Sequence, residues 1–157
     1  MKWILIAILI VVIMIIAKSF TNQYVEKYDF YFNLKSFLIQ FKLNLSFKKD
    51  KINEFLNSVK TKKQFEKFKV AYINYLDSGQ LDLSEINVMD FEEKNQLEEM
   101  ILSIGRYDAK SEIMQLETFI SEIDEKVKIS NENKLKLCPL ILKLSLLFAI
   151  GVAIILL

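Results

Sequence analysis

The chain of 157 residues begins and ends in apolar runs, and these runs limit its possible folds more than any other feature. Residues 3–17 are uncharged and lie between Lys2 and Lys18, and residues 144–157 are again uncharged. Apolar helices of this length come close to crossing the roughly 30 Å hydrocarbon core of a bilayer. Each run is therefore a candidate membrane span.

The second run lengthens when Lys143 is included. Counted from Leu140, it has about 18 residues, provided that the lysine side chain reaches the lipid headgroups. We therefore expect transmembrane helices over residues 1–20 and 137–157. This predicts a two-pass protein of the cell membrane, with the lipid bilayer as one of its partners.

A cleavable signal peptide is the alternative for the first run, because a positive start and a short apolar stretch are typical of one. The sequence Ala17-Lys18-Ser19-Phe20 has no pair of small residues suited to cleavage. We favour an uncleaved anchor, and cleavage stays open.

The flanking lysines predict the orientation of the spans. The side of both spans that faces the middle of the chain is lysine-rich, whereas the other side has Lys2 alone. These lysines are Lys18, Lys27, Lys35, Lys126, Lys128, Lys134, Lys136 and Lys143. Because basic flanks stay in the cytoplasm, we expect a cytoplasmic central domain.

Small residues recur every four positions in the second span, at Ser145, Ala149 and Ala153. Such a stripe lets another membrane helix approach closely. We predict transmembrane packing here, although small residues are also common in such helices without that role.

Residues 21–136 between the spans predict an all-α domain. They contain two glycines, Gly79 and Gly105, and no proline, so the turn residues that a sheet needs are scarce. The Thr61/Gln64 and Asp90/Glu93 pairs have the spacing of capping boxes. With the glycines as stops, they predict helices over residues 62–78 and 91–104.

Periodic apolar residues predict the remaining helices. One helix runs from Ala109 to about Asn133, with an interruption near Pro139 before the second span. Its seam consists of Ile113, Leu116, Ile120, Ile123 and Val127. A helix over 21–43 has an apolar face made of Tyr24, Tyr28, Phe30, Tyr31, Leu34, Phe37, Leu38 and Phe41. A short helix would hold Ile52, Phe55, Leu56 and Val59. In the helix over 62–78 the apolar face consists of Phe65, Phe68, Tyr72 and Leu76. A single helical turn could begin at Ser84.

Charge is divided along the chain. Residues 18–76 have twelve basic and five acidic residues, residues 77–125 have three basic and fourteen acidic, and residues 126–157 have five basic and one acidic. The oppositely charged segments could pair within the bundle, or present a basic face to lipid and an acidic face to a partner.

Catalytic motifs are missing from the sequence. It has no histidine and one cysteine, Cys138, and it lacks a glycine-rich phosphate loop and the glycine-flanked serine of hydrolases. The net charge of +1 argues against nucleic acid as a partner. We expect no catalytic residue, no cofactor and no metal, although the acidic pairs 92–93 and 98–99 leave cryptic carboxylate chemistry as a less favoured hypothesis.

Arg106 is the single arginine among twenty-one basic residues. It lies between Gly105 and Asp108 in a predicted turn between helices. A guanidinium can form paired hydrogen bonds that an ammonium cannot, so we predict either a structural turn or a partner contact at Gly105, Arg106 and Asp108.

The stretch 102–108, the sequence Asn133-Lys134-Leu135 and the final run 151–157 resemble the stage III sporulation protein AB family. Its members also begin with an apolar helix, have about this length and end in a membrane segment. The most specific match is the leucine-glycine-x-x-aspartate turn, in which Ile104 takes the place of the leucine.

The resemblance implies a mother-cell membrane protein of endospore-forming bacteria, in the complex that joins mother cell and forespore. Its cytoplasmic bundle would be similar to the cytoplasmic domains of type II secretion platform proteins. By that analogy the chain would be a non-enzymatic platform or adaptor subunit. Its partners would be other stage III sporulation subunits, among them the ATPase. The alternative is a membrane-anchored helical or coiled-coil scaffold unrelated to sporulation.

Overall fold

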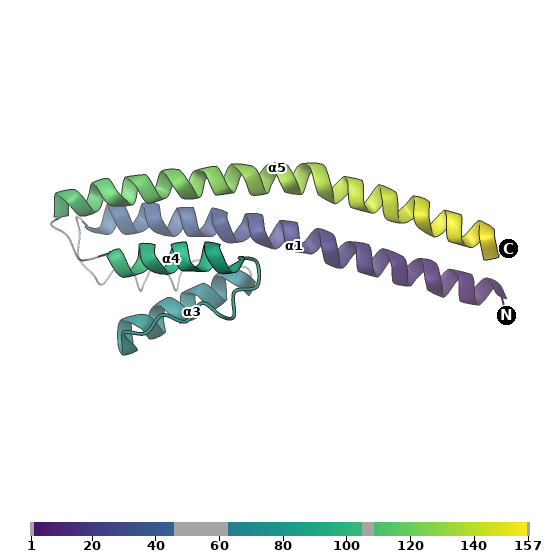
Figure 1. Ribbon diagram of the computed structural model, residues 1–157, viewed down its shortest axis with the longest axis horizontal. Helices are drawn as coiled ribbons and strands as arrows, with labels where there is room; N and C mark the ends of the chain where they lie inside the picture. Colours follow the sequence, from purple (N-terminus) through teal and green to yellow (C-terminus); the bar gives the residue numbers. More distant parts are fainter. Residues whose placement is uncertain (1, 46–62, 105–108, 157) are drawn as a thin grey trace. The chain divides into compact units, whose positions relative to one another are not determined.

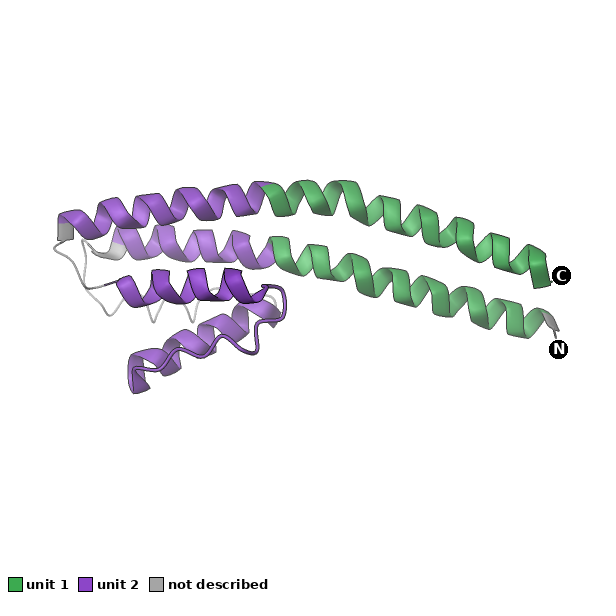
Figure 2. Ribbon diagram, viewed as in Figure 1, with its two compact units in different colours: residues 1–28, 129–157 green, residues 29–128 purple. Residues whose placement is uncertain are grey.

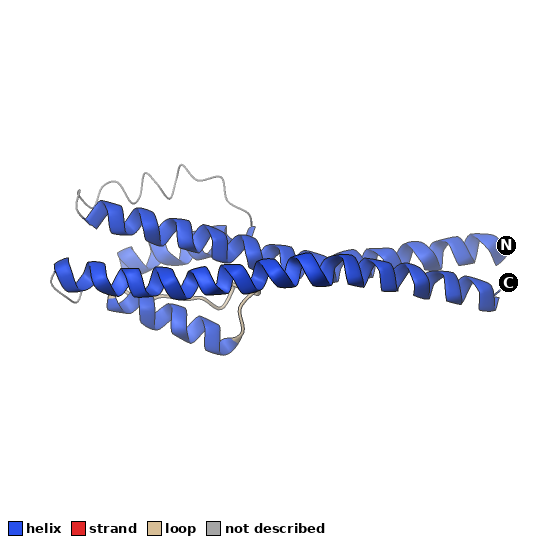
Figure 3. Ribbon diagram, turned by 90° about the horizontal axis from the view of Figure 1, so that it is seen from above, coloured by secondary structure: helices blue, strands red, loops and turns tan. Residues whose placement is uncertain are grey.

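The computed structural model describes residues 2–45, 63–104 and 109–156. These residues form helices joined by turns and contain no strand (Figures 1 and 3). The helices are α1 (Lys2–Leu45), α3 (Lys63–Ser78), α4 (Phe91–Ser103) and α5 (Ala109–Leu156). The prediction of an all-α chain is confirmed.

Two compact units make up the chain (Figure 2). Unit 1 comprises residues 1–28 and 129–157, and unit 2 comprises residues 29–128. α1 and α5 each contribute to both units, since neither helix ends at the boundary. The predicted segment boundaries after residues 20 and 136 both fall inside unit 1.

α5 continues through Pro139, so the predicted interruption of the helix is wrong. Proline lacks an N–H and leaves the carbonyl of Leu135 without its usual donor. Apolar helices of membrane proteins tolerate such a residue, because neighbouring groups and small adjustments compensate for one lost bond. Next to it, the Cys138 thiol lies 3.5 Å from the Thr21 carbonyl of α1, which ties this part of α5 to its neighbour.

Aromatic side chains form the centre of unit 2, where α1 meets α3. Phe30 lies 6.2 Å from Phe68, and Phe37 lies 5.7 Å from Phe68 and 5.2 Å from Tyr72, between ring centroids. These pairs have edge-to-face geometry, which the charge distribution of aromatic rings favours. Phe30, Phe37 and Phe68 are almost completely buried. The predicted face of α1 thus forms a wall of the core from Phe30 to Phe41, whereas its Tyr24 and Tyr28 lie in unit 1 and outside this core.

Most of the predicted apolar seams also lie in this core. Leu116 and Ile123 of α5 are buried, and Ile120 and Val127 pack against the core. Leu76, however, is 51% exposed, so the prediction for the end of α3 is wrong. It lies one turn past Tyr72, the last buried residue of α3. The predicted short helix around residues 52–59 and the cap at residue 61 lie outside the described residues.

Local signals at helix ends are confirmed where the structure describes them. Asp90 accepts a hydrogen bond from the Glu93 N–H at 2.8 Å, and Glu93 accepts one from the Asp90 N–H at 3.1 Å, which completes the capping box of α4. Gly79 follows α3 with φ of +74°, a conformation that glycine adopts without strain. At Ser84 the chain makes the single predicted turn, in which the Ile86 N–H donates to the Leu83 carbonyl at 3.1 Å and the Asp82 side chain accepts the Ser84 N–H.

The helices of unit 2 do not simply alternate in direction. Contacts of Glu93 with Lys126 and of Ser103 with Gln115 show that α4 and α5 are antiparallel. The ring contacts show that α3 instead runs in the same direction as α1. The segment after Gly79 therefore has to return along α3, where Gln64 accepts the N–H of Asn87 and Lys67 donates to the Glu85 carbonyl.

Ion pairs join the basic and acidic segments within unit 2. Lys35 of α1 lies 2.6 Å from Asp124 of α5, and Lys42 lies 2.8 Å from Glu117. Lys128 approaches Asp124 from its own helix at 2.8 Å. Intramolecular pairing, one of the two alternatives for the divided charge, is thus observed at these positions. The hydrogen bonds from Lys128 and then Lys35 lower the pKa of Asp124 from 3.8 to about 2.

Asp124→Asn should make the thermal stability of the protein depend less steeply on pH in the acidic range. Because the folded protein lowers this pKa, the ion pairs stabilise the fold above pH 3.8 and lose that effect as the pH falls toward about 2. The wild type should therefore lose thermal stability more steeply across this window than the variant, as measured by circular dichroism of the full chain in neutral detergent. Glu99→Gln, at an exposed site, should keep the wild-type slope. Equal slopes for all three proteins would contradict the role of Asp124.

Candidate functional site

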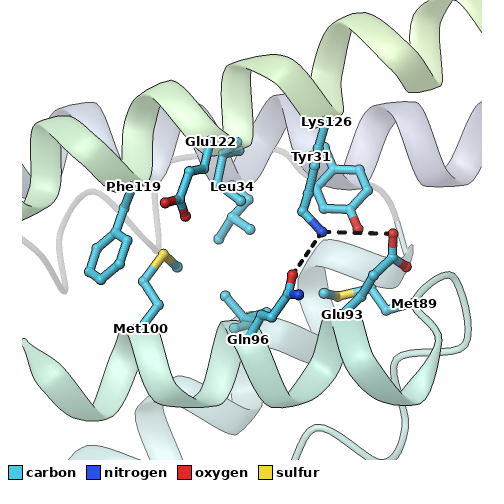
Figure 4. A pocket seen from close by; sticks show the side chains of 11 residues that line it. Tyr31, Leu34, Met89, Glu93, Gln96, Met100, Phe119, Glu122 and Lys126 are labelled. Carbon is cyan, nitrogen blue, oxygen red and sulfur yellow. Dashed lines mark hydrogen bonds and ion pairs between the residues drawn. The ribbon is translucent and has the colours of Figure 1, made fainter.

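A cluster of polar side chains lies where α1, α4 and α5 meet inside unit 2 (Figure 4). Tyr31 comes from α1, Glu93 and Gln96 from α4, and Lys126 from α5. The capping box explains the position of Glu93, because it fixes the first turn of α4 and holds this side chain at the start of the helix. The cluster therefore depends on where α4 begins.

Lys126 is the cation of this cluster. Its ammonium group lies 3.2 Å from the side-chain oxygen of Gln96, 3.9 Å from the Glu93 carboxylate and 5.7 Å from the centroid of the Tyr31 ring. The side chains of Lys126 and Glu93 are 29% and 17% exposed, respectively. A half-buried cation with three polar or aromatic neighbours is stabilised more than a surface ion pair. These contacts join α5 to both α4 and α1.

Tyr31 is buried at the side of the cluster that faces α1. Burial is the largest cause that raises its pKa above the ordinary value of 10, and the negative charge of Glu93 and hydrogen bonding to it raise the pKa further. The phenol therefore stays protonated throughout the physiological range. It acts as a neutral polar group, not as a base.

The cluster borders a cavity of about 40 Å³. Its wall is mixed, with the polar cluster on one side and apolar side chains on the other, the latter being Leu34, Met89, Leu97, Met100, Phe119 and Ile123, with Glu122 at the edge. A cavity of this size can hold water, but small-molecule sites have volumes of several hundred Å³. The arrangement thus suits the attachment of α4 to the two long helices better than the binding of a substrate.

The acidic pairs 92–93 and 98–99 both lie in α4. No group of three or more histidine, cysteine, aspartate or glutamate side chains in residues 2–45, 63–104 and 109–156 could hold a metal ion. The acidic residues of α4 point in different directions, since Glu93 joins the polar cluster whereas Glu92 and Glu99 are exposed.

The predicted turn residues Gly105, Arg106 and Asp108 lie outside the described residues. The residue before them, Ile104, caps α4 with an N–H donated to the Ile101 carbonyl at 3.2 Å. The seam of the helix after residue 109 predicts Glu112 on its solvated flank, and this prediction is wrong, because Glu112 is buried in the first turn of α5.

In unit 1, the first part of α1 and the last part of α5 run antiparallel, with both chain ends at the same end of the pair (Figure 2). Of the predicted packing residues, Ala149 is 1% exposed, while Ser145 and Ala153 are half-buried. The Ser145 hydroxyl donates to the Ile141 carbonyl of its own helix at 2.7 Å. The stripe thus has one fully covered position.

Matching small residues of α1 are not among the predicted packing positions. Ala17 and Thr21 are both buried in unit 1, and the Thr21 carbonyl accepts the Cys138 thiol. Their spacing of four residues is a small-residue pattern like that of α5, and this signal could have identified them. The polar cluster was harder to find, because its members are far apart in the sequence.

Glu93→Ala should destabilise unit 2 by about 1–2 kcal/mol, because it removes half of the capping box and a partner of Lys126 and Tyr31. Chemical denaturation of the full chain in neutral detergent, followed by circular dichroism, measures this change. Glu92→Ala is the matched control, since the neighbouring residue is exposed in the same helical turn, and its effect should stay within about 0.5 kcal/mol. Equal effects of the two variants would show that the polar cluster adds nothing.

Comparison with other proteins does not assign the chain to a family. No family model, curated protein or solved structure matches it. Function must therefore be inferred from its own residues and their geometry.

Proposed function

We propose that the chain is a two-pass membrane protein whose unit 2 binds other proteins in the cytoplasm. The observation that supports this most is the exposure of the terminal apolar segments. Two helices are long and apolar enough to cross a membrane, and within the structure only 17% and 6% of their most apolar windows are buried. Leu5, Leu147 and Ile154 are each about two-thirds exposed. Apolar surface of this extent is unfavourable in water and favourable in lipid.

The cytoplasmic location of unit 2 is supported by the lysines next to the spans. In an endospore-forming cell this location would be the mother-cell side. The positions of these lysines come from the sequence alone, so this part of the proposal does not depend on how either unit packs.

A role in assembly is supported by the character of unit 2. Its core is closed and aromatic, its cavity is of water size, and its polar cluster holds helices together. With the resemblance of residues 102–108 and 151–157, this favours a non-enzymatic platform or adaptor in the sporulation channel between mother cell and forespore. The chain would link the cytoplasmic ATPase of that complex to its membrane subunits.

A membrane-anchored scaffold unrelated to sporulation is the second candidate. The observation that favours it is the pairing of α1 with α5 in unit 2 through Lys35–Asp124 and Lys42–Glu117, since charged pairs beside an apolar seam are typical of coiled-coil scaffolds. Partner recovery distinguishes this candidate from the first.

Cysteine labelling tests the membrane topology. In a Cys138→Ser background, Gln80→Cys should react with a membrane-impermeant maleimide only after the cells are permeabilised, because residue 80 is an exposed residue of unit 2. Lys2→Cys should react in intact cells. Both variants should remain in the membrane pellet after carbonate extraction. Labelling of residue 80 in intact cells, or release by carbonate, would contradict the proposed topology.

Crosslinking in sporulating cells tests the proposed role. Wild-type protein should recover the sporulation ATPase, and Arg106→Lys should recover less of it than Lys110→Arg, because only the first substitution removes a guanidinium. Equal recovery by the two variants would contradict a contact through Arg106. Absence of the ATPase from the wild-type sample would contradict the platform proposal and favour the scaffold.

A further inference from the structure

Positive charge is concentrated in unit 1. Its residues include six lysines and two glutamates, whereas unit 2 contains fifteen basic and eighteen acidic residues. No acidic residue occurs in residues 3–25 or 133–157. The part of the chain that holds both apolar segments is therefore strongly basic.

Lys18 and Lys143 lie at the inner edges of the two apolar segments, and both are exposed. The contact between Thr21 and Cys138 fixes the register of the antiparallel pair at this point. Lys18 is three residues from Thr21 and Lys143 is five from Cys138, both toward the chain ends. At about 1.5 Å per residue, the two positions differ by about 3 Å along the helices. The lysines thus occur at nearly the same depth.

Three other charged groups of unit 1 are already engaged elsewhere. Glu132 pairs with Lys136 at 3.0 Å, and the ammonium of Lys134 lies 4.0 Å from the centroid of the Tyr28 ring. Among the residues of unit 1 that the structure describes, Lys18 and Lys143 form no ion pair with a carboxylate. Two cations at one depth, beside apolar surface and without acidic partners, are complementary to a phosphate at a membrane surface.

We propose that unit 1 binds anionic phospholipids, with Lys18 and Lys143 contacting the headgroup phosphates. This inference rests on the proposed membrane location. The apolar surface at the same level suits acyl chains, because an open groove of about 380 Å³ between the helices is lined by apolar side chains such as Ile13, Phe20, Leu144 and Phe148. The hydroxyl of Ser145 in this groove is already bonded to its own helix, so the groove offers lipid chains no competing polar group.

The test uses the purified full chain in neutral detergent, with dioleoylphosphatidylglycerol or dioleoylphosphatidylcholine added at equal concentration. Native mass spectrometry measures the affinity for each lipid. The wild type should bind the anionic lipid more tightly, and Lys18→Gln with Lys143→Gln should weaken that binding by about fivefold for each lysine. The binding of phosphatidylcholine should change little.

Lys63→Gln with Lys110→Gln is the matched control. It removes the same charge from exposed sites in unit 2 and should keep the wild-type lipid preference. Equal loss in both double variants would show a net-charge effect only and overturn the assignment to Lys18 and Lys143. Equal affinity of the wild type for the two lipids would also overturn it. Displacement of the lipid by inorganic phosphate would identify a site for free anions and overturn the lipid proposal.

Carbonate extraction of the wild type and of the Lys18→Gln/Lys143→Gln variant distinguishes failure of the lipid inference from failure of the two-pass topology. Retention of both proteins in the membrane, together with no lipid preference, would overturn the lipid inference and leave the two-pass topology standing. Release of the wild type would overturn the topology and, with it, the lipid inference.

Discussion

A single helix, α1, has to satisfy two different surroundings. Its first part is apolar on almost every face, as a membrane span would require, and its second part keeps an aromatic face that fills the core of unit 2. An α-helix can serve both because its backbone hydrogen bonds are internal and do not depend on the surroundings. α5 meets the same requirement in the opposite order. The rest of the molecule is built on these two continuous helices.

Unit 2 is held together by different interactions at different depths. The aromatic side chains that meet between α1 and α3 are buried in the core. The polar cluster around Lys126 is half-buried and determines where α4 attaches. The pairs formed by Lys35 and Lys42 lie nearer to solvent, where charge contributes less to stability and more to the choice of register.

The sequence predicted features that depend on neighbours along the chain. The capping box at Asp90, the left-handed Gly79 and the seam of α5 all follow from spacings of three or four residues. It predicted less well where distant segments decide the outcome, as in the exposure of Leu76, the parallel direction of α3 and the contacts of Tyr31 with Glu93 and Lys126. At Pro139 a local rule gave a wrong prediction, because one missing hydrogen bond does not outweigh the helix on either side.

Gly79, the residue after α3, is restricted by its backbone conformation and not by the space around it. A β-carbon built at this position meets no atom within 4 Å, yet φ is +74°. There is room for a methyl group. The restriction comes from the positive φ, which strains the backbone of any L-residue that has a β-carbon. A mirror-image alanine, introduced by chemical synthesis, would fit the turn that ordinary L-alanine strains, so the stop signal at this helix end is one of chirality and not of size.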